Sequence, residues 1–179
     1  MKIMMTIVVA SAISALLAAP TPDARSAPEG SQPADDFSTI DGVISALYDV
    51  ISGPPGPRNW DRFRDLFAEQ GRLVATGQRP DGSLAVRHMT PDEYIERSGP
   101  TLEGRGFFER EVARRLEAFG PIAHAFSTYE SRREADGAPF ARGINSIQLL
   151  KDGDRWYILS VFWANETETN PLPEKYLPS

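Results

Sequence analysis

The chain has 179 residues, 41% hydrophobic and 25% charged, which is the balance of a soluble globular domain. Its formal net charge of −6 disfavours binding to nucleic acid, because phosphate contacts need clustered Lys and Arg. The absence of cysteine excludes disulfides, thiolate catalysis, zinc–thiolate sites and iron–sulfur clusters.

The first residues have the pattern of a secretory signal peptide. Lys2 precedes an apolar run from Ile3 to Ala19, and a Pro-rich stretch of small residues follows. We expect residues 1–19 to be a signal peptide and residues 20–34 a disordered leader. Cleavage would leave a periplasmic or secreted protein with no stable membrane insertion. The alternative is that the apolar run remains as an uncleaved membrane anchor.

A single folded domain is expected over residues 35–179, and three helices are predicted in its first half. Hydrophobic residues at helical spacing occupy residues 37–51, and Asn59 is a natural N-cap for a second helix that extends to Gly71. Residues 72–90 form a predicted hairpin around the turn sequence RPDG. Thr90 then begins the third helix, with Pro at its first position.

The second half of the domain is predicted to be mostly strands. Strands are expected at residues 121–132, 142–150 and 155–164, separated by the turns EADGAPF and KDGD. The segment GFFEREVARRLEAFG that precedes them is ambiguous. Its composition favours a helix, although a strand is also compatible with its hydrophobic pattern.

Helices followed by antiparallel strands indicate an α+β fold. The stretches RNWDRFRDLFAEQGRLV and FGPIAHAFSTYESRREADGAPFARGINSIQLLKDGDRWYILSVFW resemble the nuclear transport factor 2-like superfamily, including its SnoaL-like members. The chain thus resembles an exported bacterial member of that superfamily. The resemblance implies a cone, in which a strongly curved antiparallel sheet wraps three N-terminal helices and leaves a pocket. It also implies a strand over residues 107–118 and a homodimer packed sheet against sheet.

His124 is the first candidate for chemistry. It alternates with apolar residues on its strand, and an imidazole can act as a general acid or base near neutral pH. The alternative is a core histidine bonded to a neighbouring residue. Tyr48 matches the position of the catalytic tyrosine in ketosteroid isomerase, a member of the superfamily. The matching base position reads VATG, with no carboxylate, so isomerase chemistry of that kind is disfavoured.

Three further residues are candidates for contact with a ligand. Asn145 is a polar amide on an otherwise apolar strand face, and Trp163 shares a face with Leu159 and Val161 near the end of the last strand. Arg142 could bind a ligand carboxylate, or could pair with Glu130. Each of the three also has a purely structural interpretation, in packing or in hydrogen bonding.

Glu109 and Glu111 would be pocket acids if their strand faced inward; a solvated charge run is the plainer interpretation. Two distant histidines and no cysteine give no metal signature, and we expect no cofactor. The sequence therefore predicts an exported domain that binds a small, largely apolar molecule, with cofactor-free acid/base chemistry such as isomerisation, cyclisation or dehydration. The alternative is a non-catalytic dimeric binding or interaction module.

Overall fold

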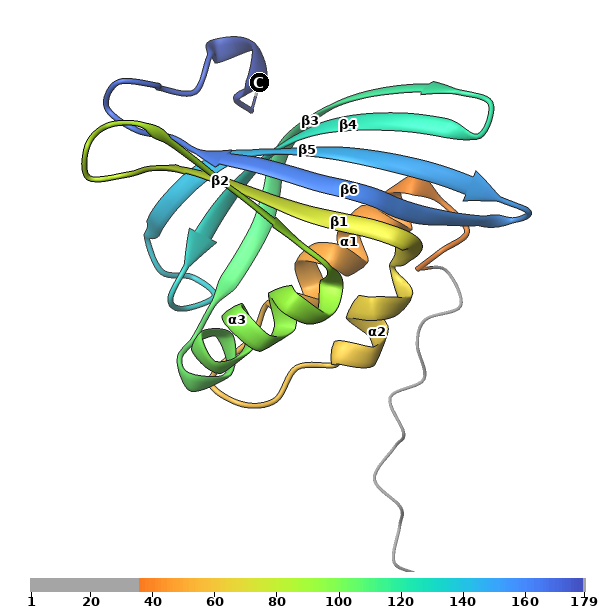
Figure 1. The fold of residues 1–179 in the computed structure, drawn as a ribbon, viewed down its shortest axis with the longest axis horizontal. Coiled ribbons are helices and arrows are strands. Elements are labelled where there is room, and N and C mark those ends of the chain that lie inside the picture. The colour runs from red at the N-terminus through yellow and green to blue at the C-terminus, as the bar shows by residue number, and fades with distance from the viewer. Residues whose placement is uncertain (1–35, 179) are drawn as a thin grey trace, which may run out of the picture. The chain divides into compact units, whose positions relative to one another are not determined.

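The computed structural model describes residues 36–178. The predicted signal peptide and leader lie outside the described residues. Six strands form one sheet in the order β2-β1-β6-β5-β4-β3, in which β1 and β6 are parallel and all other neighbours antiparallel. The sheet curls around α1, α2 and α3, and the C-terminal segment lies over its other face (Figure 1). We call the face toward the helices the inner face and the opposite one the outer face.

The three helices begin close to where the sequence predicts. Helix α1 spans Ile40–Ile51, α2 spans Trp60–Asp65 and α3 spans Pro91–Gly104. Asn59 caps α2 as expected, and a capping box at Thr90 begins α3. Thr39 caps α1, because its hydroxyl accepts a hydrogen bond from the backbone N–H of Gly42, three residues later (3.0 Å).

Strand β1, Phe67–Gln78, begins earlier than the sequence predicts. The second helix was expected to reach Gly71, yet it ends at Asp65. The reason is tertiary pairing: Phe67 lies opposite Ile158 of β6, whose backbone N–H donates to the carbonyl of Leu66 (2.8 Å). These ladder contacts override the helical propensity of the sequence after Asp65.

The remaining strands are β2 (Leu84–Met89), β3 (Phe108–Phe119), β4 (Ile122–Arg132), β5 (Pro139–Asp152) and β6 (Arg155–Asn165), followed by a short 3-10 helix at Glu174–Tyr176. The ambiguous segment is therefore a strand. Strand β3 pairs along its whole length with β4, with one bulge between Glu111 and Ala113. Long pairing with a neighbouring strand outweighs the helix-forming composition of EREVARR.

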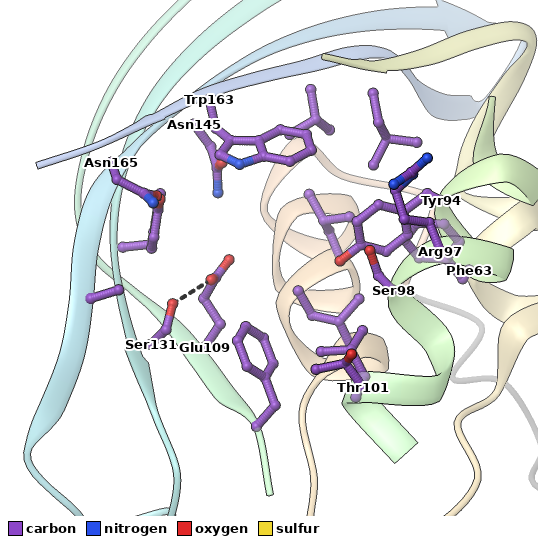
Figure 2. Close-up of a pocket in the computed structure, with 18 of the residues that line it drawn as sticks. Phe63, Tyr94, Arg97, Ser98, Thr101, Glu109, Ser131, Asn145, Trp163 and Asn165 are labelled. Atoms are coloured by element: carbon purple, nitrogen blue, oxygen red, sulfur yellow. Dashed lines mark hydrogen bonds between the residues drawn. The ribbon is translucent and has the colours of Figure 1, made fainter. Parts of the chain in front are cut away.

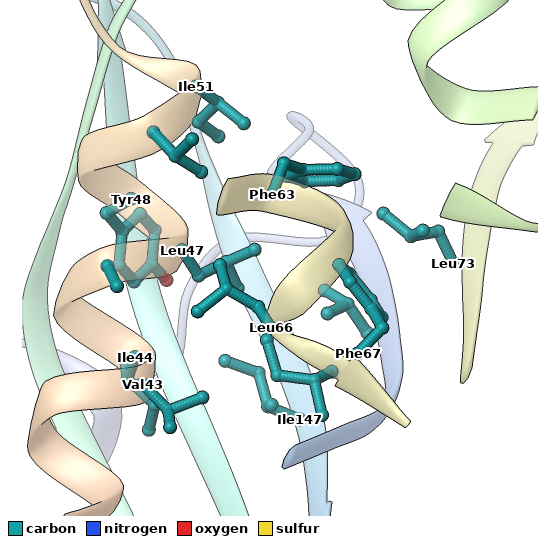
Figure 3. Close-up of a cluster of buried hydrophobic side chains, with 14 of the residues drawn as sticks. Val43, Ile44, Leu47, Tyr48, Ile51, Phe63, Leu66, Phe67, Leu73 and Ile147 are labelled. Atoms are coloured by element: carbon teal, nitrogen blue, oxygen red, sulfur yellow. The ribbon is translucent and has the colours of Figure 1, made fainter. Parts of the chain in front are cut away.

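The hydrophobic core lies between the inner face of the sheet and the helices (Figure 3). Helix α1 contributes Val43, Ile44 and Leu47, which are almost fully buried, and Phe63 of α2 packs its ring against Phe67. Burial of such side chains is the main favourable contribution to folding. The core fills one part of the space that the curved sheet encloses and leaves a cavity in the rest.

Arg58 holds together the loop that follows α1. Its guanidinium donates five hydrogen bonds of 2.9–3.2 Å, all of them to backbone carbonyl oxygens, which belong to Ile51, Gly53, Pro54, Gly56 and Leu102. One side chain thereby joins the end of α1 to the last turn of α3. The two helices that flank the cavity are fixed relative to each other by this contact.

Candidate functional site

A cavity of about 410 Å³ lies between the inner face of the sheet and helices α1 and α3 (Figure 2). Its volume is within the range of small-molecule sites. Most of its wall is apolar and includes Leu47, Phe63, Leu73, Leu102, Phe107 and Val161. Polar side chains occur in two groups: one on the strands, around Glu109, and one on helix α3.

Among the residues that the structure describes, Glu109 contributes the only carboxyl group in the wall of this cavity. The Ser131 hydroxyl donates to its Oε2 (2.6 Å), and Figure 2 shows its other oxygen directed toward the open space. Burial raises the pKa of Glu109 from its ordinary value of 4.5 to about 7, although the side chains of Ser131 and Asn145 act to lower it. Desolvation in an apolar cavity is therefore the dominant influence on this group.

The end of α1 fixes the position of Glu109. The backbone N–H of Glu109 donates to the hydroxyl of Ser52 (2.9 Å), and the Ser52 hydroxyl donates to the carbonyl of Tyr48 (2.6 Å). One residue pair away, Gly53 and Phe107 exchange two backbone hydrogen bonds (2.7 and 3.1 Å). The start of β3 is thus attached to α1, and strand alternation then directs Glu109 inward.

A chain of hydrogen bonds runs beside this carboxyl, and donor chemistry fixes its direction. Ser127 donates to Oε2 of Glu111, which forms an ion pair with Arg114 (3.0 Å). The Tyr48 hydroxyl then donates to Ser127 Oγ (2.7 Å) and accepts from Nδ2 of Asn145 (3.0 Å). Burial raises the pKa of Tyr48, so its hydroxyl keeps its proton. This chain holds the Asn145 amide in one orientation at the cavity wall.

Tyr129 closes the cavity on the side of β5 and β6. Its hydroxyl passes over Gly143 and donates to Oδ1 of Asn165 (2.5 Å). A Cβ atom at Gly143 would lie 2.5 Å from that hydroxyl oxygen, so only glycine fits beneath it. Burial raises the pKa of Tyr129, and the phenol remains neutral at ordinary pH.

Two predicted site residues line the cavity and a third is attached to it. Asn145 and Trp163 are in the wall, and Tyr48 reaches it through Asn145. Trp163 does not share its face with Leu159 as expected, because a bulge between Gln148 and Leu149 in the β5–β6 pairing shifts the alternation. Leu159 is accordingly 44% exposed, while Val161 is buried.

The other two predicted residues lie on the outer face. His124 shares its face with Ile122 and Phe126 as expected, but this face points away from the cavity, and Nε2 of His124 lies 3.2 Å from Ser146 Oγ. Its ring also packs edge-on against Phe126, with 5.9 Å between centroids. His124 is therefore bonded to a neighbouring residue, which is the structural alternative named in the sequence analysis.

Arg142 forms a two-pronged ion pair with Glu166, with nitrogen–oxygen distances of 2.8 and 3.1 Å. The sequence suggested Glu130 as its partner. Glu130 lies opposite Arg142 in the strand register but pairs with Arg110 and Arg132 instead.

The sequence named Glu109 and Glu111 as pocket acids only on the condition that their strand faced inward, and it favoured a solvated charge run. The signal is the alternation of Phe107, Glu109 and Glu111, which places all three on one face only if the segment is a strand. Ser131 and the polar residues of α3 carry no motif and were found from the structure.

Within residues 36–178, no cluster of three or more His, Cys, Asp or Glu side chains could hold a metal ion. The helices in this part of the chain are too short or too polar to cross a membrane.

No protein-family model and no curated protein matches the sequence. The structure is similar to several solved structures. A variant of Rv3472, a protein of unknown function from Mycobacterium tuberculosis, is 16% identical over 74% of this chain and 73% of that chain, with a TM-score of 0.56. A protein of unknown function with a cystatin-like fold from Nostoc punctiforme is 13% identical over 72% of this chain and 90% of that chain, with a TM-score of 0.54. LinA is 9% identical over 78% of this chain and 91% of that chain, with a TM-score of 0.53.

At these identities the likeness shows the fold. It is a cystatin-like fold, in which a curved sheet wraps around helices, and the cone predicted from the sequence is confirmed.

Proposed function

We propose that this cone-shaped domain binds a small, largely apolar organic molecule in its cavity, and that Glu109 exchanges a proton with the bound molecule. The observation that carries this proposal is the position of Glu109, a buried carboxyl group held by Ser131 in the wall of a cavity that is mostly apolar. A carboxyl group placed there costs stability, because its ionised form is poorly solvated. Such a cost is typical of functional sites.

A pKa of about 7 suits Glu109 to acid/base chemistry at neutral pH. Both protonation states are populated there, so the group can donate or accept a proton. Oε2 is held by Ser131, and the other carboxyl oxygen, on the side of the Asn145 amide, would meet the ligand. The reactions that need only such a group are proton transfers without a cofactor: isomerisation, cyclisation or dehydration.

Glu109 takes the role that the sequence suggested for His124. The His124 ring lies on the outer face, on the far side of the sheet from the cavity. A proton carrier must lie within hydrogen-bond reach of the reacting atom, and geometry takes precedence over pKa.

Binding can be tested with the neutral fluorescent probe prodan, an apolar molecule of naphthalene size. We expect a blue-shifted emission that saturates with protein concentration. Ala141→Phe fills the cavity and should abolish the signal, whereas Ala118→Phe, the same change at an exposed position of β3, should not alter it. A wild-type protein that gives no signal, or a signal that survives Ala141→Phe, would contradict binding in this cavity.

The outer face favours a second candidate, a non-catalytic dimeric interaction module. Ile122 is 57% exposed and Phe162 is 47% exposed, although both are large apolar residues on this face. Exposed apolar side chains of this kind are typical of an interface. Light scattering on the purified protein tests the predicted sheet-to-sheet homodimer: a dimer that Phe162→Glu converts to a monomer supports it, and a wild-type monomer contradicts it.

Export of the protein is also a proposal, supported by the pattern of residues 1–19. Mass spectrometry of the protein purified from the periplasm of a bacterial host would test it. We expect a chain that begins after Ala19 or within the next few residues, and an intact N-terminus would contradict cleavage.

A further inference from the structure

Helix α3 presents an unusual stripe of polar side chains to the cavity. Tyr94, Arg97, Ser98 and Thr101 all line it, at the spacing i, i+3, i+4 and i+7 that places residues on one side of a helix. A helix that packs on a core ordinarily turns an apolar face inward. Here the wall formed by α3 carries a guanidinium and hydroxyl groups, opposite Glu109 across the open space (Figure 2).

Arg97 is a solvent-exposed residue of the cavity wall, and it differs from the arginines of the domain that form ion pairs. Arg62, Arg64, Arg114 and Arg142 each pair with carboxylates. In residues 36–178, by contrast, the side chain of Arg97 has neither an ion-pair nor a hydrogen-bond partner, and the same is true of Thr101 one turn later. Both residues are exposed to solvent and also line the cavity, so they are available to an acceptor that enters it.

The charge around the cavity is opposite to that of the whole chain. The chain has a net charge of −6, yet the cavity wall holds two arginines, Arg97 and Arg133, and one carboxyl, Glu109. The guanidinium of Arg133 stacks on the Phe140 ring, 4.0 Å from its centroid, and within residues 36–178 it forms no ion pair with a carboxylate. A concave site lined by one sign of charge concentrates ligands of the other sign.

We propose that the molecule bound in the cavity is an organic carboxylic acid, whose carboxylate is held at the α3 wall by Arg97 and Thr101 and whose apolar body extends toward Glu109. This inference rests on the proposed binding function. A planar guanidinium matches a carboxylate in geometry, and a single one matches its single charge. The apolar body would lie along Leu102, Phe107 and Val161.

Binding of the ligand carboxylate at the α3 wall keeps it apart from the carboxyl group of Glu109. A ligand carboxylate beside Glu109 would face a like charge, whereas at the α3 wall it faces a cation. The end of the ligand that reaches Glu109 is then its neutral, reacting end. Arg97 acts as a positioning group in this scheme, because it binds the ligand without contact with the transferred proton.

Competition against prodan tests the proposal with two matched probes, naphthoate and naphthamide, which have the same shape and differ in charge. We expect naphthoate to displace prodan at about a tenfold lower concentration than naphthamide, as a charge-assisted hydrogen bond allows. Arg97→Gln should bring the two concentrations together, and Arg97→Lys, which keeps the charge, should restore part of the difference. A higher salt concentration should weaken the binding of naphthoate and leave the binding of naphthamide unchanged.

Arg105→Gln is the control, because Arg105 ends the same helix, is exposed and does not line the cavity. It should leave the naphthoate preference unchanged. The carboxylate assignment would be overturned if both probes displaced prodan equally from the wild type, or if the naphthoate preference survived Arg97→Gln. Either result would leave binding in the cavity intact. Tenfold stronger displacement by naphthyl phosphate than by naphthoate would reassign the subsite to phosphate esters. Absence of prodan binding would contradict the proposed function itself.

Discussion

Glu109→Gln should stabilise the protein at alkaline pH and leave it nearly unchanged at acid pH. In the folded protein the pKa of Glu109 is about 7, against an ordinary value of 4.5 that applies when the chain is unfolded. Below about pH 4.5 both states hold the proton, and no cost arises. Between the two values the folded state keeps a proton that the unfolded state has lost, so the free energy of unfolding falls as pH rises. Above about pH 7 the full cost is present.

The difference of about 2.5 in pKa corresponds to a cost of about 3 kcal/mol, at about 1.36 kcal/mol for each pKa unit. Gln keeps the shape of Glu and an acceptor for the Ser131 hydroxyl, but it cannot ionise. Urea unfolding between about pH 4 and pH 8 should therefore show the variant gaining up to about 3 kcal/mol over the wild type as pH rises. The same substitution at Glu117, exposed on the same strand, is the control. Curves for Glu109→Gln that stay parallel to those of the wild type would refute the reasoning.

Three further predictions concern stability and the placement of the site. Arg58→Met should lower the free energy of unfolding by about 3 kcal/mol or more in a urea titration, because five backbone carbonyls lose their donor. The control is Arg64→Met, which removes only exposed ion pairs and should cost less than about 1 kcal/mol in the same titration. Phe63→Ala should cost about 3–5 kcal/mol by calorimetry, and a cost below about 1 kcal/mol would contradict the packing shown for this ring. His124→Ala should leave prodan affinity unchanged, and a large loss of affinity would return His124 to the site.

The sequence predicts the order of the elements well, because local signals mark most of their ends. The capping box at Thr90, the N-cap at Asn59 and the Gly-containing turns between the last strands are all chemistry of neighbouring residues. The segment EREVARR could not be decided in this way. Its local preference is helical, and only its pairing with β4 makes it a strand.

The site is harder to predict than the fold, since it depends on which face of each strand points inward. Alternation places His124 and Phe126 on one face of β4 and Ser127 on the other, but the sequence does not say which face meets the helices. Bulges add a second difficulty, as Leu159 shows: one extra residue in β6 turns it out of the face that Trp163 occupies. Glu109 could therefore be named from the sequence only as a conditional pocket acid, because the face of β3 that points inward is set by tertiary pairing.

The central claim is that desolvation in the cavity raises the pKa of Glu109 to about 7, so that a large share of this carboxyl group is protonated at neutral pH. Carbon NMR of the protein with labelled glutamate side chains tests this directly, since the shift of each carboxyl carbon follows its ionisation, and the Glu109→Gln variant identifies the resonance. The account predicts a midpoint near 7 for Glu109. A midpoint near the ordinary value of 4.5 would contradict it, and with it the proposed acid/base role of this residue.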